Sequence, residues 1–443
     1  MLQLVRKFCL AVAIVGLVTM AVGLVSGSST VTRPVAVVAA VALAISFGEF
    51  PALRSYQFTA WIVAVVVAAM LYPEPLLQLN PDNKSLPLNK WIMLLVVQLV
   101  MFGMGTQMRL RDFALKGRMS YGVIIGLVLQ FSIMPLVGWT IGRLAGFPPE
   151  IAAGMVLIGS CSSGLASNVM TYLAGGNLAL SVTVTALGTL LAPLMTPLWM
   201  KVLAGELVKV EFFKMMTDIT KLVVVPIGAA MLHDYLKFAS PLGRKIVWLL
   251  AAVGFLTIAA MLCGVGDYLA DRLSTDAMIA VTLGCFFLGA IVAGAIYHVL
   301  WARWPTIQCW MPRLSMCGIV YFTAITTAAG RDELLKIGML LLAAVIVHNL
   351  IGYTLGYWLS RGAGLDVNSA RTIALEVGIH NGAMASGIAI GMNKLATVGL
   401  PAAIFSPWMN VSGSILANYW RKRQRGEISQ SPEQTSTESL AKS

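Results

Sequence analysis

Long apolar segments separated by short polar stretches run along almost the whole chain. Each segment has about 17–25 residues, the length that an α-helix needs to cross a membrane. The segments lack the period-two alternation of half-buried β-strands. The pattern therefore predicts an all-α polytopic membrane protein with about fourteen transmembrane helices, near residues 5–26, 34–50, 56–73, 90–107, 120–144, 150–174, 177–203, 210–236, 245–264, 276–301, 311–329, 335–361, 368–393 and 398–421.

Two of these segments are interrupted by glycine and polar residues. The interruptions are SCSSGLASNVMTYLAGGN (160–177) and ALEVGIHNGAMASGIAIG (374–391). Backbone that leaves the helix at membrane depth is tolerated only inside the protein or along a watery cavity. Such a break exposes N–H groups that attract anions, and it exposes carbonyl oxygens that suit a hard cation. A glycine-rich helix-packing seam is the alternative interpretation.

The two interruptions occupy corresponding places in the two halves of the chain. A division near residue 206 leaves seven predicted helices on each side. An odd number of helices per half gives the halves opposite orientations in the membrane. Paired broken helices in such an inverted repeat indicate the binding site of a secondary transporter.

The charge distribution favours membrane topology as the cause of the net charge of +12. Only 11% of the residues are charged, against roughly 25% in soluble domains. Lysine and arginine gather in alternate short loops and at both ends, as in RLRDFALKGR and RKRQR. The positive-inside rule then predicts a multi-pass protein of the plasma membrane with both termini in the cytoplasm. We expect no nucleic-acid partner.

The two ends of the chain differ in character. The apolar run in residues 1–26 is longer than the ~7–15-residue core of a signal peptide, so we expect it to be retained as a helix. Residues 422–443 are polar and predict a disordered cytoplasmic tail.

Glu376 stands inside the second interruption, among apolar neighbours. A carboxylate at mid-membrane costs on the order of 2.5–3.5 kcal/mol, and such residues mark ion paths or proton relays. A bound cation would neutralise it, whereas a hydrogen-bonded structural glutamate is the alternative.

The sequence predicts that the protein is not an enzyme. It lacks the Walker, Rossmann, HExxH and GxSxG motifs. Cys161 or Ser162 with His380 could supply a nucleophile and a base, but no third member accompanies them. A non-transporting intramembrane enzyme or receptor therefore remains only an alternative, and the six cysteines show neither metal nor disulfide spacing.

Several strings of the sequence resemble the bile acid:sodium symporter family, in particular its bacterial members. They are GMGTQMRLRDF, QFSIMP, ASNVMTYLAGGNLALSVTVT, PLMTPLWMKVLAGE, HNLIGY, EVGIHN and FSPWMNVSGS. The resemblance implies a ten-helix inverted repeat with a core domain, a panel domain and two crossed discontinuous helices. It also implies a symporter that imports an organic anion together with Na⁺ by alternating access.

The resemblance further implies two sodium sites. The first would comprise Ser167, Asn168, Ser181, Thr185 and Glu376. The second would use the following groups: Gln130, Glu376, the carbonyls of Val377 and Ile379, and His380, where the family has glutamine. Imidazole is a poor ligand for a hard cation. Three interpretations remain open: the other oxygens keep the second site, a proton on His380 replaces the ion, or the site is lost.

The same resemblance assigns substrate-binding positions to Asn381 and Asn410, and to Leu165 and Ala166 at the first interruption. The bacterial family has Pro-Gly-Gly-Thr before ASN, and this chain has SSGL. Leu165 thus replaces a threonine hydroxyl, which favours a different ligand. A small carboxylate, a keto acid, a sulfonate and a steroid-like acid all remain open.

The resemblance divides the chain into four parts. Residues 1–55 form an extra helix pair, 56–205 the first repeat, and 206–421 the second repeat, which contains an inserted helix pair at about 243–305. Residues 422–443 form the tail. We expect the extra pairs to enlarge the panel, or to form a lipid contact or a homo-oligomer contact.

Overall fold

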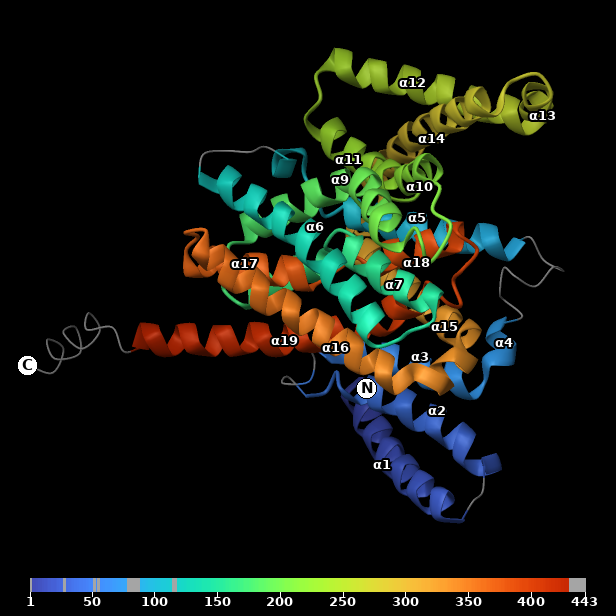
Figure 1. The fold of residues 1–443 in the computed structure, drawn as a ribbon. Coiled ribbons are helices and arrows are strands. Elements are labelled where there is room, and N and C mark those ends of the chain that lie inside the picture. Colours follow the sequence, from blue (N-terminus) through green and yellow to red (C-terminus); the bar gives the residue numbers. More distant parts are fainter. Residues whose placement is uncertain are drawn as a thin grey trace, which may run out of the picture.

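The computed structural model describes residues 2–26, 29–50, 53, 56–77, 88–113 and 118–429, and every regular element in them is helical. A helix or a broken pair of helices lies in each of the fourteen apolar segments (Figure 1). The elements are α1 (Leu2–Ser26), α2 (Ser29–Ser46), α3 (Gln57–Leu71), α4 (Pro73–Leu77), α5 (Leu88–Gly105), η2 (Leu110–Phe113), α6 (Arg118–Leu144), α7 (Pro149–Ser160), α8 (Leu165–Leu173), α9 (Leu178–Ala204), α10 (Phe212–Ile219), η3 (Thr220–Val224), α11 (Val225–Phe238), α12 (Pro241–Ala260), η4 (Met261–Val265), α13 (Gly266–Ala270), α14 (Thr275–Arg303), α15 (Ile307–Ala329), α16 (Arg331–Gly362), α17 (Val367–Gly378), α18 (Gly382–Gly391) and α19 (Leu400–Ser429).

Seven helical segments within the described residues are long and apolar enough to cross a membrane, and the bent pair α7–α8 makes an eighth. The sequence predicts fourteen spans. Part of the difference lies in three helices whose apolar stretches, Thr32–Ser46, Gln57–Leu71 and Ile92–Gly105, hold 10–17 residues. These fall short of the ~20 residues that the hydrocarbon core requires of an untilted helix.

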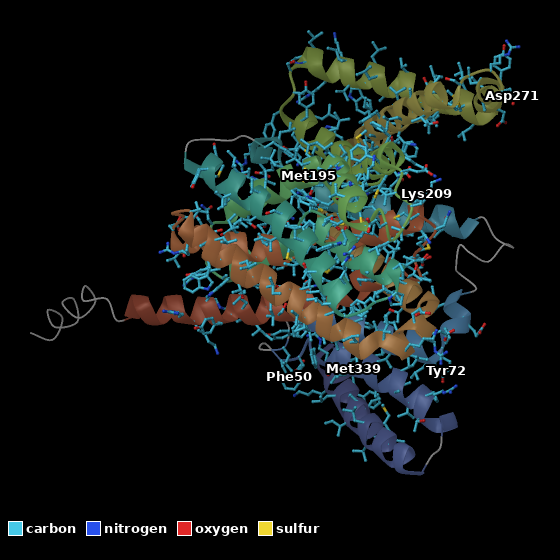
Figure 2. The ribbon with its side chains drawn as sticks, in the orientation of Figure 1. Phe50, Tyr72, Met195, Lys209, Asp271 and Met339 are labelled. Atoms are coloured by element: carbon cyan, nitrogen blue, oxygen red, sulfur yellow. The ribbon has the colours of Figure 1, made fainter. Side chains whose placement is uncertain are left out.

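Two helical hairpins stand apart from the rest of the molecule. Figure 1 shows α1–α2 at one end and α12–α14 at the other. Figure 2 places Asp271 at the tip of the second hairpin, beside α13. Few residues of α12 and α14 are buried within the protein. Their broad apolar surfaces suit a lipid environment, in which exposed leucine and valine carry no cost.

The remaining helices form two contacting groups. One group packs α6, α9, α16 and α19 around the broken pairs α7–α8 and α17–α18. The other contains α3, α5, α11 and α15. The second broken segment lies at the centre, because every residue from Ser369 to Ile390 is buried. The protein thus encloses the backbone that lipid cannot satisfy.

The predicted boundary of the C-terminal tail is wrong by eight residues. Helix α19 continues through Ser429, so residues 422–429 are helical. Lysine, arginine, glutamine and glutamate follow Trp420, and these are good helix formers that extend the helix past the apolar segment. Residues 430–443 lie outside the described residues.

Candidate functional site

The two chain breaks lie against each other. Helix α7 ends at Ser160 and α8 begins at Leu165, with a bend of 57° between them. The second break separates α17 from α18 at residues 379–381. The backbone N–H of Asn381 donates to the carbonyl oxygen of Ser162 (2.8 Å). Two interruptions more than 200 residues apart in sequence are therefore joined through their backbones.

Glu376 is fully buried near the end of α17 and faces the other broken segment. Its carboxylate accepts hydrogen bonds from the hydroxyls of Ser163 and Ser181, and from Thr185 Oγ1 at 2.9 Å. Ser163 comes from the first break, and the other two hydroxyls come from α9. Three hydroxyls from two further elements thus converge on one carboxylate inside the membrane-spanning part of the protein.

Asn168 extends this cluster of oxygens. Its Oδ1 atom lies 2.8 Å from Ser181 Oγ and 3.3 Å from Thr185 Oγ1. Ser167 Oγ lies 3.4 Å from Thr185 Oγ1. The structure therefore brings together the five residues of the first predicted sodium site, and it adds the hydroxyl of Ser163.

The oxygen cluster has more acceptor sites than protons. Each hydroxyl carries one proton, yet Ser181 Oγ lies within hydrogen-bonding distance of Glu376, Asn168 and Thr171. A carboxylate and neutral oxygens are ligands that hard cations prefer. Among the described residues no group of three or more His, Cys, Asp or Glu side chains could hold a metal ion. Glu376 supplies the single negative charge of the cluster, which suits a monovalent cation.

Local sequence explains the position of the α9 hydroxyls. Ser181 and Thr185 are four residues apart and share one helix face. Asn177 caps the start of α9, where its side chain accepts from the N–H of Leu180 (3.1 Å). The N–H of Asn177 donates to Thr372 Oγ1 of α17 (2.8 Å). This bond fixes α9 relative to the helix that carries Glu376.

The residues of the second predicted sodium site are all fully buried. Among the described residues, both amide atoms of Gln130 lack a hydrogen-bond partner, and so does Nε2 of His380. The other ring nitrogen, Nδ1, lies 3.1 Å from the carbonyl oxygen of Cys161. Val377 and Ile379 flank the end of α17. The described contacts do not link Gln130 to Glu376 or His380 directly, so the grouping of these residues remains a prediction.

The predicted substrate residues lie at the breaks and on α19. Asn381 caps α18 by accepting from the N–H of Met384 (3.1 Å), and its amide faces the sulfur of Met104. Leu165 and Ala166 begin α8 and are half-buried. Asn410 donates to Ser406 within its own helix (2.7 Å). No described contact joins Asn410 to Asn381, so their common role stays a prediction.

A second layer of side chains holds the end of α17. The amide of Asn349 donates to the carbonyl oxygen of Gly378 (2.7 Å) and accepts from Ser412 Oγ (2.7 Å). The ring of Tyr353 approaches Gly378 so closely that a Cβ there would lie 2.2 Å from its Cδ1 atom. These supports were not predicted as site residues, since nothing near them in the sequence links them to residue 378.

Ser163 is the main contact of Glu376 that the sequence analysis did not assign to the ion site. The sequence predicts a role for it only as part of the altered SSGL string next to the substrate. The sequence does carry a signal, because Ser160, Ser162, Ser163 and Ser167 form a run of hydroxyls within the first interruption. A helix break at membrane depth that is rich in hydroxyls indicates a polar ligand.

Comparison with known proteins finds similarity to transporters. Residues 94–272 match the sodium bile acid symporter family. The chain is 32% identical to the uncharacterized sodium-dependent transporter YocS of Bacillus subtilis, over 83% of this chain and 91% of YocS. It is 28% identical to the probable chloroplastic sodium/metabolite cotransporter BASS1 of Oryza sativa, over 83% and 73% of the two chains. The ileal sodium/bile acid cotransporter of Homo sapiens is 28% identical over 67% of this chain and 68% of its own.

Proposed function

The chain belongs to the sodium bile acid symporter family, and we propose that it is a sodium-coupled symporter that imports an organic anion across the cell membrane. As a member of a transporter family, it is not an enzyme. The names of its relatives support sodium dependence, since they describe sodium-dependent transporters and cotransporters. Those names differ in the transported compound, so the substrate must be inferred from this chain.

The observation that carries the proposal is the convergence of oxygens on Glu376. Sodium would bind between its carboxylate, the side-chain oxygen of Asn168 and the hydroxyls of Ser163, Ser181 and Thr185. These ligands come from both broken segments and from α9. Sodium bound there would stabilise the arrangement in which the two breaks touch.

Coupling follows from where the half-helices begin. The first residue of α8, Leu165, and the first of α18, Gly382, stand next to the breaks. Their free N–H groups and positive helix ends favour an anionic group of the substrate. Sodium would order these N-termini before the anion arrives, with Asn381 and Asn410 as polar partners and Leu165 and Ala166 as apolar wall.

We propose that α6–α9 and α16–α19 form the core and that α3, α5, α11 and α15 form the panel of an inverted repeat. In support, the two helix groups contact each other mainly through α18 and α19. A shift of the core against the panel would open the site to one side at a time. Six further helices would also cross the membrane, giving fourteen spans with both termini in the cytoplasm: α1, α2, α3, α5, α15 and α19.

A second sodium or a proton could accompany the first ion. The unpartnered amide of Gln130 favours a second cation, because a buried amide without partners is costly. The other candidate is a proton on Nε2 of His380, which has no hydrogen-bond partner among the described residues. His380→Gln separates the two candidates: it would strengthen sodium dependence if the histidine displaces the ion.

The proposal is tested by uptake into proteoliposomes that contain the full chain. Labelled organic acids are offered as a panel of a short keto acid, a sulfonate and a steroid-like acid, with an inward gradient of sodium or of potassium. We expect sodium-driven accumulation of one class, abolished in Glu376→Gln. Accumulation driven by a proton gradient without sodium would show that the coupling ion is a proton and would refute sodium symport. Facilitated equilibration without either gradient would refute coupled transport.

A further inference from the structure

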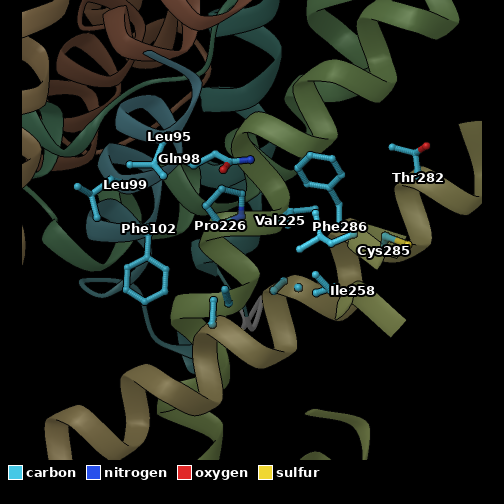
Figure 3. Close-up of a pocket in the computed structure, with 15 residues that line it drawn as sticks. Leu95, Gln98, Leu99, Phe102, Val225, Pro226, Ile258, Thr282, Cys285 and Phe286 are labelled. Carbon is cyan, nitrogen blue, oxygen red and sulfur yellow. The ribbon is translucent and has the colours of Figure 1, made fainter. Parts of the chain in front are cut away.

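An apolar groove separates the inserted hairpin from the rest of the protein. Its volume is about 740 Å³, within the range of ~300–1,000 Å³ typical of small-molecule sites. Figure 3 shows its walls, with Leu95, Gln98 and Phe102 on α5 facing Phe286 and Cys285 on α14 across α11. The groove lies away from Glu376 and its ligands, so sodium binding does not explain it.

Small side chains on α14 create the space. Cys285, Gly289 and Ala293 recur at four-residue intervals and line the groove. The stretch of α14 from Thr282 to Ala293 that borders it is roughly 17 Å long at 1.5 Å per residue. The two π-helical turns in the described part of the chain, η3 and η4, both adjoin the groove. Such turns are frequent at functional sites.

Two polar side chains, those of Gln98 and Lys221, lie at or beside this apolar groove. A Cβ on Gly387 of α18 would lie 3.0 Å from Val97 and 3.8 Å from Leu222, so the side chains of these two residues lie close to each other. Their chain neighbours are Gln98 and Lys221. Gln98 lines the groove, and the ammonium of Lys221 lies 5.5 Å from the ring centroid of Phe286, which also lines it.

Neither polar group is satisfied by the described protein. The side chain of Gln98 makes no hydrogen bond to a described residue, and Lys221 has no ion pair within the described residues. Asp218, the nearest acid along the helix, lines a separate pocket with Lys209 and Lys214. Lys221 is nine residues from the start of α10, roughly 14 Å along the helix. An ammonium and an amide at this depth call for a polar partner.

We propose that the groove binds a long-chain carboxylate, namely a fatty-acid anion taken from the membrane. The chain lies along the small residues of α14, and the carboxylate accepts hydrogen bonds from Lys221 and the amide of Gln98. A carboxylate matches the positive charge of the ammonium and is compact enough for this depth. The bulkier phosphate and glycerol of a phospholipid belong at the membrane surface. The site is independent of the proposed transport function.

The test uses the purified full chain, stripped of bound lipid, and three probes. These are palmitate, hexadecanol as its uncharged counterpart, and a phosphatidylglycerol. Native mass spectrometry measures how many molecules of each probe the protein retains, and titration measures the affinity for each. We expect one palmitate per chain, bound at least ~10-fold more tightly than hexadecanol, because a charge-assisted hydrogen bond is lost in the alcohol. Preferential binding of the phosphatidylglycerol, or equal binding of palmitate and hexadecanol, would overturn the proposal.

Matched variants locate the site. Lys221→Gln should weaken palmitate binding by at least about 10-fold and remove its advantage over hexadecanol. Lys214→Gln, an exposed lysine on the same segment, should bind as the wild type does. Ala290→Phe fills the groove and should weaken both probes. Gln98→Leu gives a second polar variant in case Lys221→Gln does not fold, as judged by gel filtration. Wild-type palmitate affinity in folded Lys221→Gln or Gln98→Leu would refute the assigned contact.

Discussion

The backbone N–H of Asn381 donates to the carbonyl oxygen of Ser162 across a distance of 2.8 Å. One atom belongs to the break before α18 and the other to the break before α8. A ligand that orders one break therefore also restrains the other break, because neither can move without losing this hydrogen bond. The side chains around Glu376 reinforce the connection, since they also come from both segments.

Glu376→Gln should abolish stabilisation by sodium. Thermal unfolding of the purified protein in sodium and in potassium at equal ionic strength measures it. A ligand at 100 times its Kd stabilises the folded state by about 2.7 kcal/mol. The wild type should show a sodium-specific shift, and the variant should show none. Without sodium the variant should be at least as stable as the wild type, since it removes a buried charge. A sodium shift retained in Glu376→Gln would contradict the site, and Glu333→Gln in the first turn of α16 provides the control.

Gln130→Leu distinguishes an ion ligand from a structural amide. Both amide atoms are buried and lack partners, which costs about 1–3 kcal/mol. We expect the variant to unfold at a higher temperature than the wild type without sodium. Its sodium-induced shift should be smaller if Gln130 binds a second ion. An unchanged sodium shift together with higher stability would show that the residue is not a ligand.

Gly378→Ala should destabilise the end of α17. The added Cβ would lie 2.2 Å from the Tyr353 ring, which is held by bonds to Ser412 and Met409. Overpacking of this kind costs about 1–3 kcal/mol. Gly362→Ala is the control, because nothing lies within 4 Å of its added Cβ. Thermal denaturation in detergent should show a melting temperature below that of the wild type for Gly378→Ala only. Equal behaviour of both variants would mean that Tyr353 gives way freely.

Asp366→Ala should weaken the start of α17 in a pH-dependent manner. Burial raises the pKa of the Asp366 carboxyl, but hydrogen bonds from Ser369 and Asn368 outweigh it, and the net pKa lies below its usual range. The stabilisation is therefore complete above the unfolded pKa of about 3.9 and is lost as the pH falls through the lower folded pKa.

We expect the loss of this cap to cost about 1 kcal/mol at pH 7. The difference in melting temperature between Asp366→Ala and the wild type should narrow below about pH 4. Glu211→Ala, which removes a residue at another N-cap position without a cap bond, should leave stability unchanged. A difference that stays constant down to pH 3 would assign the effect to helix propensity alone.

The sequence by itself determined where the helices lie, where two of them break and which carboxylate stands beside a break. These features are local, because the membrane requires about 20 apolar residues per span and because each charged residue within a span costs free energy. The match to family strings added Asn168, Ser181 and Thr185 as candidate neighbours of Glu376, although no local pattern shows that they meet.

Only the tertiary structure decided which side chains touch. It turned Ser163 toward Glu376, placed Asn349 and Tyr353 behind Gly378, and left Gln98 beside an open groove. It also extended α19 beyond the apolar segment. Contacts between residues that are distant in sequence depend on the packing of whole helices and on the level at which one helix meets another. Hydropathy fixes that level only to within several residues, which is too coarse to say which side chains face each other.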